Sequence, residues 1–229
     1  KETLIKDHAI VINDKKIVAL CPHKEAADKF ITSNIIELDN HILIPGLINA
    51  HCHAPMTLLR GIADDLPLED WLNKKIWPLE EKFISQEFVE DGAELAIAEM
   101  ILSGTTCFAD MYFYPDCVAK KAIDSNMRVQ LACPVLDFPT IWAQSADEYI
   151  QKTITIHDNY RNSELISVAF GPHAPYTVSD APLKKIGALA EELDIPIHMH
   201  VHETEKEISD SMKEFGCRPL RRLSNLRLV

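Results

Sequence analysis

The chain has 229 residues, of which 47% are hydrophobic, 25% charged and 7% aromatic. This composition excludes a disordered chain, a collagen and a coiled coil. A net charge of −12, from 23 Lys and Arg against 35 Asp and Glu, repels phosphate backbones and anionic lipids. We therefore expect neither nucleic acid nor a membrane as a partner. In addition, no apolar run reaches the about 18 residues that a membrane helix needs.

Residues 1–44 predict a small β-rich module. Two short apolar strands, 9–12 and 17–20, flank a polar turn, which is the pattern of a β-hairpin. A helical stretch near 25–30 follows, and a further strand is expected at 35–38. We interpret this segment as part of a small N-terminal β-sandwich domain.

From residue 45 onward, strands and helices alternate. Near-continuous apolar strands in such a series predict a parallel sheet with helices packed against it. The expected strands are 42–50, 105–112, 128–136, 165–170 and 195–201. The expected helices are 68–83, 85–104, 115–125, 145–158, 183–193 and 205–215. Ser85, Ser145 and Ser179 are expected to cap three of these helices.

The position of the polar residues favours a barrel over an open sheet. Side chains that can bind a metal or move a proton follow the expected strands. They are His51, His53, Asp110, His173, His200 and Glu203. Strand ends meet at one mouth in a barrel, whereas they spread along an edge in a doubly wound sheet. A glycine-rich phosphate loop is also missing after the first of these strands. We therefore predict an α/β fold in which residues 45–229 form the N-terminal portion of a TIM-like (β/α)₈ barrel.

The predicted barrel is incomplete, with about five of eight strands. A full barrel takes about 250 residues, and only about 180 follow Pro45. The sequence also begins at Lys1 with neither an initiator Met nor an apolar signal segment. We expect a chain that has lost residues upstream and strands downstream.

Cysteine usage predicts a reducing compartment. The cysteines are Cys21, Cys52, Cys107, Cys117, Cys133 and Cys217. No two form a C-x-x-C pair, which argues against a zinc ribbon, a thioredoxin-like motif and the deaminases with P-C-x-x-C. Several lie in apolar strand-like runs, where buried free thiols are common. We therefore expect a cytoplasmic protein.

Two groups of histidines suggest a metal site. His51 and His53 are two residues apart on a strand, so their imidazoles point to the same side and can share one ion. An H-x-H pair is also typical of surface histidines beside a turn. His198, His200 and His202 repeat the spacing on the last expected strand. We predict that His200 is a ligand and that His198 is a hydrogen-bonded core histidine, one layer deeper.

Glu203 suggests hydrolysis. A carboxylate beside a metal ion and its water can carry the proton that hydrolysis must move. His202 and Glu203 begin like the H-E-x-x-H motif of zinc proteases, but position 206 is Lys. A zinc protease is therefore excluded.

These residues resemble a known family. Residues 45–53, P-G-L-I-N-A-H-C-H, are similar to the first-strand signature of the amidohydrolase superfamily, P-G-x-[IV]-[ND]-x-H-x-H. Residues 54–61, 68–72, 170–176 and 198–204 resemble the methylthioadenosine/S-adenosylhomocysteine deaminase branch. The s-triazine hydrolases and guanine deaminases share much of this pattern. The resemblance covers essentially the whole chain.

The resemblance implies the roles of the metal-site residues. His51, His53 and His200 would ligate one divalent ion, usually Zn²⁺, with Fe²⁺ or another metal left open. Glu203 would protonate a purine ring nitrogen while hydroxide attacks the carbon that carries the amine. Two-metal members have a bridging Lys near the fourth strand, where this chain has Gly-Pro-His173, so a single ion is favoured.

The resemblance also implies substrate contacts. His173 would contact the purine ring, and Trp71 and Glu80 would line the ribose end, where a carboxylate accepts from both hydroxyls. The alternatives are a loop histidine at 173 and an ordinary amphipathic helix around Trp71 and Glu80. Members that bind the homocysteine carboxylate use an arginine after the third strand. This chain has Ala-Cys-Pro at 132–134, which favours a neutral tail.

Three functions remain open from the sequence. The first is metal-dependent hydrolytic deamination of a small-molecule 6-aminopurine nucleoside, with release of ammonia. The second is an s-triazine or guanine aminohydrolase. The third is an inert remnant, because the family's strand-six His and strand-eight Asp lie beyond Val229. The number of subunits stays open, a homo-oligomer included.

Overall fold

The computed structural model describes residues 4–229, and the chain divides into two compact units, Lys1–Ile44 and Pro45–Val229. Each unit is described by itself. Within the described residues, no helix combines the length and the apolar content that a bilayer crossing requires.

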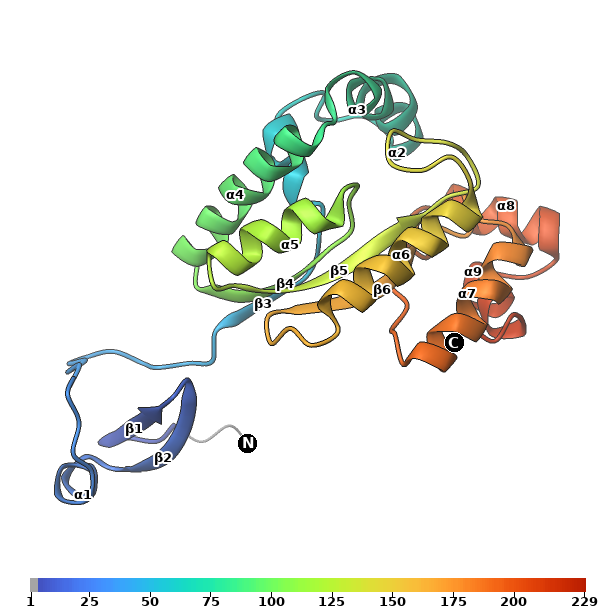
Figure 1. Cartoon of the computed structure of the whole chain (residues 1–229). Helices are drawn as coiled ribbons and strands as arrows, with labels where there is room; N and C mark the ends of the chain where they lie inside the picture. Colours follow the sequence, from blue (N-terminus) through green and yellow to red (C-terminus); the bar gives the residue numbers. More distant parts are fainter. Residues whose placement is uncertain (1–3) are drawn as a thin grey trace. The chain divides into compact units, whose positions relative to one another are not determined.

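The first unit is built on a β-hairpin. Strands β1 (His8–Asn13) and β2 (Lys16–Pro22) pair antiparallel, and helix α1 (His23–Lys29) follows (Figure 1). Both turn residues, Asp14 and Lys15, have positive φ angles of 47° and 66°, as a tight hairpin turn requires. The hairpin and the helix confirm the prediction for these segments.

The strand expected at 35–38 is wrong. These residues have no regular structure, and Ile35 and Ile36 are 72% and 73% exposed. An apolar run becomes a strand only where a neighbouring strand supplies hydrogen bonds and a covered face. The two-stranded sheet of this unit supplies neither to 35–38.

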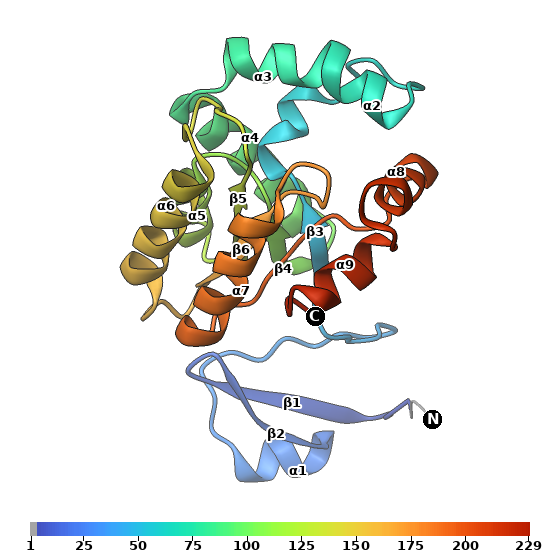
Figure 2. The same ribbon diagram turned by 90° about the vertical axis from the view of Figure 1, so that its right-hand side faces the viewer.

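The second unit contains a four-stranded parallel sheet. Its strands pair in chain order, as Figures 1 and 2 show. They are β3 (Leu47–Cys52), β4 (Thr105–Asp110), β5 (Arg128–Val135) and β6 (Ile166–Pro172). The α/β class and the parallel sheet are thereby confirmed.

Helices cover one face of this sheet. Those in contact with the strands are α4 (Gln86–Leu102), α5 (Pro115–Asp124), α6 (Ala146–Tyr160) and α7 (Asp180–Leu193). Figure 1 shows α5 and α6 lying along the strands. Between the two layers Phe108, Phe170 and Tyr149 are fully buried. Burial of each such side chain contributes about 2–3 kcal/mol and fixes the strand ends in place.

Two of the three predicted caps are present. Ser85 Oγ accepts from Phe88 N at 3.1 Å, and Ser145 Oγ accepts from Glu148 N at 3.3 Å. Ser179 precedes α7, but its side chain makes no capping bond. A capping hydroxyl accepts from the second or third helical N–H, and the third residue here is Pro182, which has none.

The helix expected at 68–83 is interrupted. It consists of α2 (Leu68–Trp71), a π-turn (Leu72–Ile76) and α3 (Trp77–Phe83). Pro78 has no N–H to donate to the preceding turn, so the ladder of α-helical hydrogen bonds cannot run unbroken through this point.

The fifth strand, expected at 195–201, is absent as a strand. One bridge joins Phe170 and Ile197, and His198 N donates to the carbonyl of Phe170 at 2.9 Å. The segment thus runs beside β6 in the predicted place. Pro196 cannot donate to a ladder, and no described strand pairs with the other side of the segment. Two helices follow, α8 (Glu205–Phe215) as predicted and α9 (Pro219–Asn225), which was not predicted.

Candidate metal centre

The three predicted ligands come from two distant parts of the chain. His51 lies on β3, His53 immediately follows that strand, and His200 lies on the extended segment beside β6. Next to His173, Gly171 allows β6 to approach β5 closely. A Cβ at this position would lie 2.7 Å from the carbonyl oxygen of Ala132. The close approach packs the end of β6, which His173 follows, against β5.

The ring nitrogens of the three histidines converge. His200 Nε2 lies 3.1 Å from His51 Nε2 and 3.3 Å from His53 Nε2. One ligand atom from each residue lies within 4.8 Å of the other two. Two imidazoles on a tetrahedral zinc ion, with Zn–N of about 2.0–2.1 Å, have their nitrogens about 3.3 Å apart. The spacing therefore fits a single ion of this kind.

The outer nitrogens define the protonation of two rings. His53 Nδ1 donates to the carbonyl of Met111 at 2.5 Å, and His200 Nδ1 donates to the carbonyl of His173 at 2.8 Å. A carbonyl only accepts, so the proton of each neutral ring is on Nδ1 and a lone pair on Nε2 faces the other ring. Two facing lone pairs repel unless a cation lies between them. The donor set fits a metal ion.

His51 has another histidine as its outer partner. Its Nδ1 lies 2.8 Å from Nε2 of His198, and the two rings are stacked with centroids 5.0 Å apart. A metal on Nε2 of His51 puts the proton on Nδ1, which makes His198 the acceptor. His198 is therefore hydrogen-bonded, as predicted, although it is half-buried rather than part of the core.

The surroundings keep these rings neutral. Burial first, and then the neighbouring imidazoles, lower the pKa of His51 to about 4. Burial likewise lowers the pKa of His53 to about 4 and that of His173 to about 3. Since only a neutral imidazole has a free lone pair, His51 and His53 are available to a metal below neutral pH.

His173 packs on the same cluster. Its ring centroid lies 5.0 Å from that of His200, and its Nδ1 lies 3.1 Å from Thr177 Oγ1. Tyr176 packs edge-on against His173 at 6.2 Å. His173 therefore lies beside the metal centre and also supplies the carbonyl that orients His200.

Glu203 lies three residues beyond His200 and is exposed. Its backbone N–H donates to the buried carboxylate of Glu207 at 2.7 Å. Its carboxylate is close enough to Tyr176 to contribute, after burial, to raising the pKa of that phenol to about 12. The backbone of Glu203 is thus held by Glu207.

Comparison with known proteins identifies the family. Residues 42–228 match the amidohydrolase family. The chain belongs to this family. A 5-methylthioadenosine/S-adenosylhomocysteine deaminase of Saccharophagus degradans is 53% identical over 221 residues, which are 96% of this chain and 50% of that protein.

Solved structures agree with this membership. The crystal structure of an adenosine deaminase from Xanthomonas campestris with bound zinc has a TM-score of 0.96 and 47% identity, and the match covers 98% of this chain and 51% of that one. An atrazine chlorohydrolase from Arthrobacter aurescens, complexed with zinc, has a TM-score of 0.86 at 22% identity and shows a shared fold. This amidohydrolase chain spans about half the length of the curated relatives it matches.

Glu80 lies near the metal centre of the amidohydrolase chain. Tyr112, just beyond the end of β4, donates its hydroxyl to Glu80 Oε1 at 2.7 Å, and its ring centroid is 6.5 Å from that of His53. Burial raises the pKa of Glu80 to about 7, against the opposing effect of this hydrogen bond. The Glu80 carboxyl is therefore held by Tyr112, whose ring lies beside His53.

Trp71 lies at the end of α2 and is half-buried. The segment 68–83 that carries it spans the carboxyl ends of the strands, as Figure 2 shows. One end reaches β4 through Glu80, and the other reaches α8, where Glu69 lies 3.8 Å from Lys206. Trp71 and Glu80 are therefore on one segment that crosses the carboxyl ends of the strands, and Glu80 contacts Tyr112 there.

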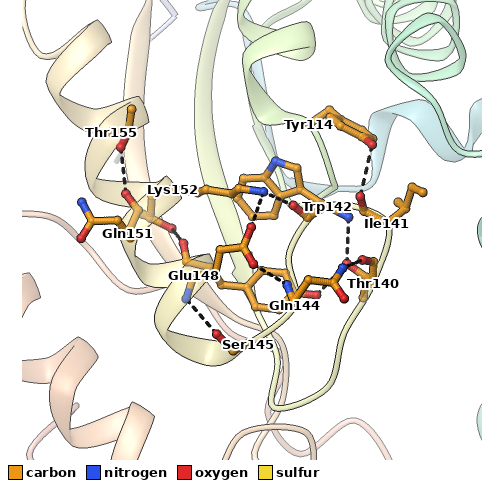
Figure 3. Close-up of polar contacts among 12 residues, drawn as sticks. Tyr114, Thr140, Ile141, Trp142, Gln144, Ser145, Glu148, Gln151, Lys152 and Thr155 are labelled. Carbon is orange, nitrogen blue, oxygen red and sulfur yellow. Dashed lines mark hydrogen bonds and ion pairs between the residues drawn. The ribbon is translucent and has the colours of Figure 1, made fainter.

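The loop between β5 and α6 is held by its own polar network (Figure 3). Lys152 donates to the carbonyl of Trp142 and pairs with Glu148 at 2.9 Å. Glu148 also accepts from the backbone N–H of Gln144 at 2.8 Å. The sequence has no arginine between Arg128 and residue 161, so this amidohydrolase loop has none to offer a substrate carboxylate.

Two further residues support the centre. Asp110, the last residue of β4, is 1% exposed and accepts from the backbone N–H of Ala54, which directly follows His53, at 2.5 Å. Glu207, which accepts from the backbone N–H of Glu203, was not predicted from the sequence. The spacing Thr204-x-x-Glu207 is a capping box and was a sequence signal for it.

Proposed function

We propose that this amidohydrolase chain is part of a metal-dependent hydrolytic deaminase that releases ammonia from a 6-aminopurine nucleoside. The observation that carries the proposal is the convergence of the Nε2 atoms of His51, His53 and His200. The Nδ1 atom of each ring makes a hydrogen bond on the opposite side of the ring. The methylthioadenosine/S-adenosylhomocysteine deaminases and the zinc-containing adenosine deaminase, about 50% identical to this chain, support the substrate class.

His51, His53 and His200 would hold the ion, for which we propose Zn²⁺. A zinc ion at this point supplies a Lewis acid that lowers the pKa of water. Glu203 takes the proton from the attacking water and gives it to the ring nitrogen beside the carbon that bears the amine. Protonation of this ring nitrogen makes the neighbouring carbon, which bears the amine, a better electrophile.

The remaining predicted residues bind the substrate. His173 packs against the purine ring beside the metal centre. Glu80, held by Tyr112, accepts from the ribose hydroxyls, and Trp71 on the same segment covers this end of the nucleoside. We infer a neutral 5′ tail, because a carboxylate tail needs a cation and the loop after β5 has no arginine.

We also propose the architecture in which this site works. Residues 45–229 would be the N-terminal portion of a TIM-like barrel, and residues 1–44 part of a small β-sandwich. The TM-score of 0.96 to a chain twice as long supports this assignment. All six cysteines are free thiols, which supports a cytoplasmic location.

Zinc binding by the 229-residue chain is the first test. Titration of metal-free protein with Zn²⁺ should raise its melting temperature, since about a hundredfold excess over the dissociation constant stabilises by about 2.7 kcal/mol. His200→Ala should abolish this shift, and His23→Ala, on the exposed first turn of α1, should retain it. A wild-type chain that does not bind zinc would overturn the proposal.

Ammonia release is the second test. We expect release from methylthioadenosine or adenosine, and Glu203→Gln should bind zinc normally yet release at least about a hundredfold less ammonia. Turnover of melamine-like rings or guanine alone would instead indicate the second function. Zinc binding with no turnover of any of these compounds would indicate an inert remnant.

A further inference from the structure

The turn between His200 and α8 is organised around one buried carboxylate. Glu207 is 6% exposed. Its Oε1 accepts from His202 N at 3.0 Å and its Oε2 accepts from Glu203 N at 2.7 Å. None of the ion pairs found in residues 4–229 includes Glu207. A buried carboxylate without a cation is costly unless N–H groups satisfy it, and two consecutive amides do so here.

The turn that Glu207 holds is backbone-strained. His202 has a φ angle of +62°, in the left-handed region that non-glycine residues avoid. Such a conformation persists only where the surroundings impose it. Besides Glu207, the backbone N–H of Leu220 reaches His202 Nε2 at 3.4 Å. The turn is therefore maintained by its hydrogen bonds with Glu207 and Leu220 rather than by the backbone preference of His202.

The His202–Glu203 turn determines the direction of the Glu203 side chain. In a continuing strand, residues three apart point to opposite faces, so His200 and Glu203 would lie on opposite sides. A left-handed residue between them breaks that alternation. With the alternation broken, the Glu203 carboxylate can lie on the same side of the segment as His200.

The hydrogen bonds of Glu207 differ from those of an ordinary helix cap. In a capping box, the acidic residue returns to the N–H of the cap residue, which here is Thr204. Thr204 Oγ1 does accept from Glu207 N at 3.1 Å. The Glu207 carboxylate, however, passes beyond Thr204 to the amides of His202 and Glu203. Its hydrogen bonds therefore hold the amides of the turn and not the N–H of the cap residue Thr204.

We propose that Glu207 is a positioning residue that holds the strained His202–Glu203 turn and thereby aims Glu203 at the metal centre. The role of Glu203 as proton carrier rests on the proposed function. The geometric part, that Glu207 fixes the turn, stands on the hydrogen bonds alone.

Amide hydrogen exchange on the full 229-residue chain tests the geometric part. In Glu207→Ala, exchange of the His202 and Glu203 amides should accelerate about tenfold or more. Glu207→Gln, which keeps one acceptor oxygen and the same shape, should produce a smaller acceleration. The amides of Ser211 and Met212, inside α8, should change by less than about twofold in both variants.

Two variants serve as controls. Glu205→Gln removes an equal charge from the exposed first turn of α8, and Thr204→Ala removes the cap but leaves the Glu207 carboxylate. Both should leave the His202 and Glu203 amides slow. Equal acceleration across all of α8 in Glu207→Gln would show a plain helix-stabilising residue and overturn the proposal, as would unchanged exchange at 202 and 203 in Glu207→Ala.

Zinc binding and turnover test the consequence for Glu203. Glu207 touches none of the three proposed ligands, so zinc affinity of Glu207→Gln should stay within about twofold of wild type. In a chain that releases ammonia, Glu207→Gln should lower kcat about tenfold with an unchanged KM. An unchanged kcat overturns the proposal. If the wild-type chain releases no ammonia, the proposed function fails by itself and the exchange measurement decides whether Glu207 holds the turn.

Discussion

At the scale of single residues, the metal centre depends on side chains whose protonation is determined by neighbouring hydrogen-bond partners. The carbonyls of Met111 and His173 keep the Nε2 atoms of two histidines free, and Tyr112 holds Glu80 in a half-buried position. Burial lowers the pKa of His53 and raises that of Glu80, and a shifted pKa makes stability depend on pH.

Glu80→Gln should make the protein more stable at alkaline pH. The pKa of Glu80 is about 7 in the fold and about 4.5 in the unfolded chain, so between these values the folded state binds more protons. Stability then falls as pH rises from about 4.5 to above 7, by up to about 3 kcal/mol. Urea unfolding at pH 5 and pH 8 should show this loss in the wild type and a smaller loss in the variant.

Glu81→Gln is the matched control, because Glu81 is exposed on the same helix. It should have the pH dependence of the wild type. Equal pH dependence in Glu80→Gln and the wild type would mean that Glu80 is ionised throughout this range.

At the scale of elements, the segment that leaves β3 is held by α4. A Cβ on Gly92 of α4 would lie 2.4 Å from the carbonyl oxygen of Pro55, two residues after His53. Gly92 of α4 thus packs directly against the backbone of Pro55, just after His51 and His53. Asp110 secures the same segment through Ala54 N.

Gly92→Ala should therefore destabilise the protein by about 1–3 kcal/mol, measured by chemical unfolding. In an open helical position the same change stabilises by up to about 1 kcal/mol. Gly187→Ala in α7 is the control with that expected sign, since its nearest neighbour would be 3.7 Å away. A stabilising Gly92→Ala would contradict the close approach and its role in placing His53.

At the scale of the whole molecule, β3 is an edge strand of the sheet. Leu47 and Ile48 are 52% and 71% exposed, and no strand within residues 4–229 pairs with the outer side of β3. An exposed apolar edge is a template for pairing with another chain. The net charge of −12 opposes this association but does not remove the edge.

Ile48→Lys should reduce concentration-dependent self-association of the 229-residue chain, because a charge on an edge strand opposes strand pairing. Sedimentation velocity over a range of concentrations measures this effect. Leu102→Lys adds the same charge at the exposed end of α4, 89% exposed, and should have a smaller effect. Equal effects of the two variants would indicate that charge alone governs association.

The amino-acid sequence by itself determined the features that depend on near neighbours. Hydrophobic periodicity placed the four strands and the helices α4 to α8, and Ser85 and Ser145 marked two helix starts. The spacing of His51 and His53 put both rings on one side, and the motif around them indicated the amidohydrolase family.

Tertiary structure decided what depends on partners far along the chain. Residues 35–38 and 195–201 are apolar enough for strands, yet a strand needs hydrogen bonds that only a neighbouring strand supplies. The contact between His51 Nδ1 and His198 Nε2 joins residues 147 positions apart, which no local pattern encodes. Local propensity selects the conformation of a segment, whereas the free energy of burying and pairing polar groups decides which segments meet.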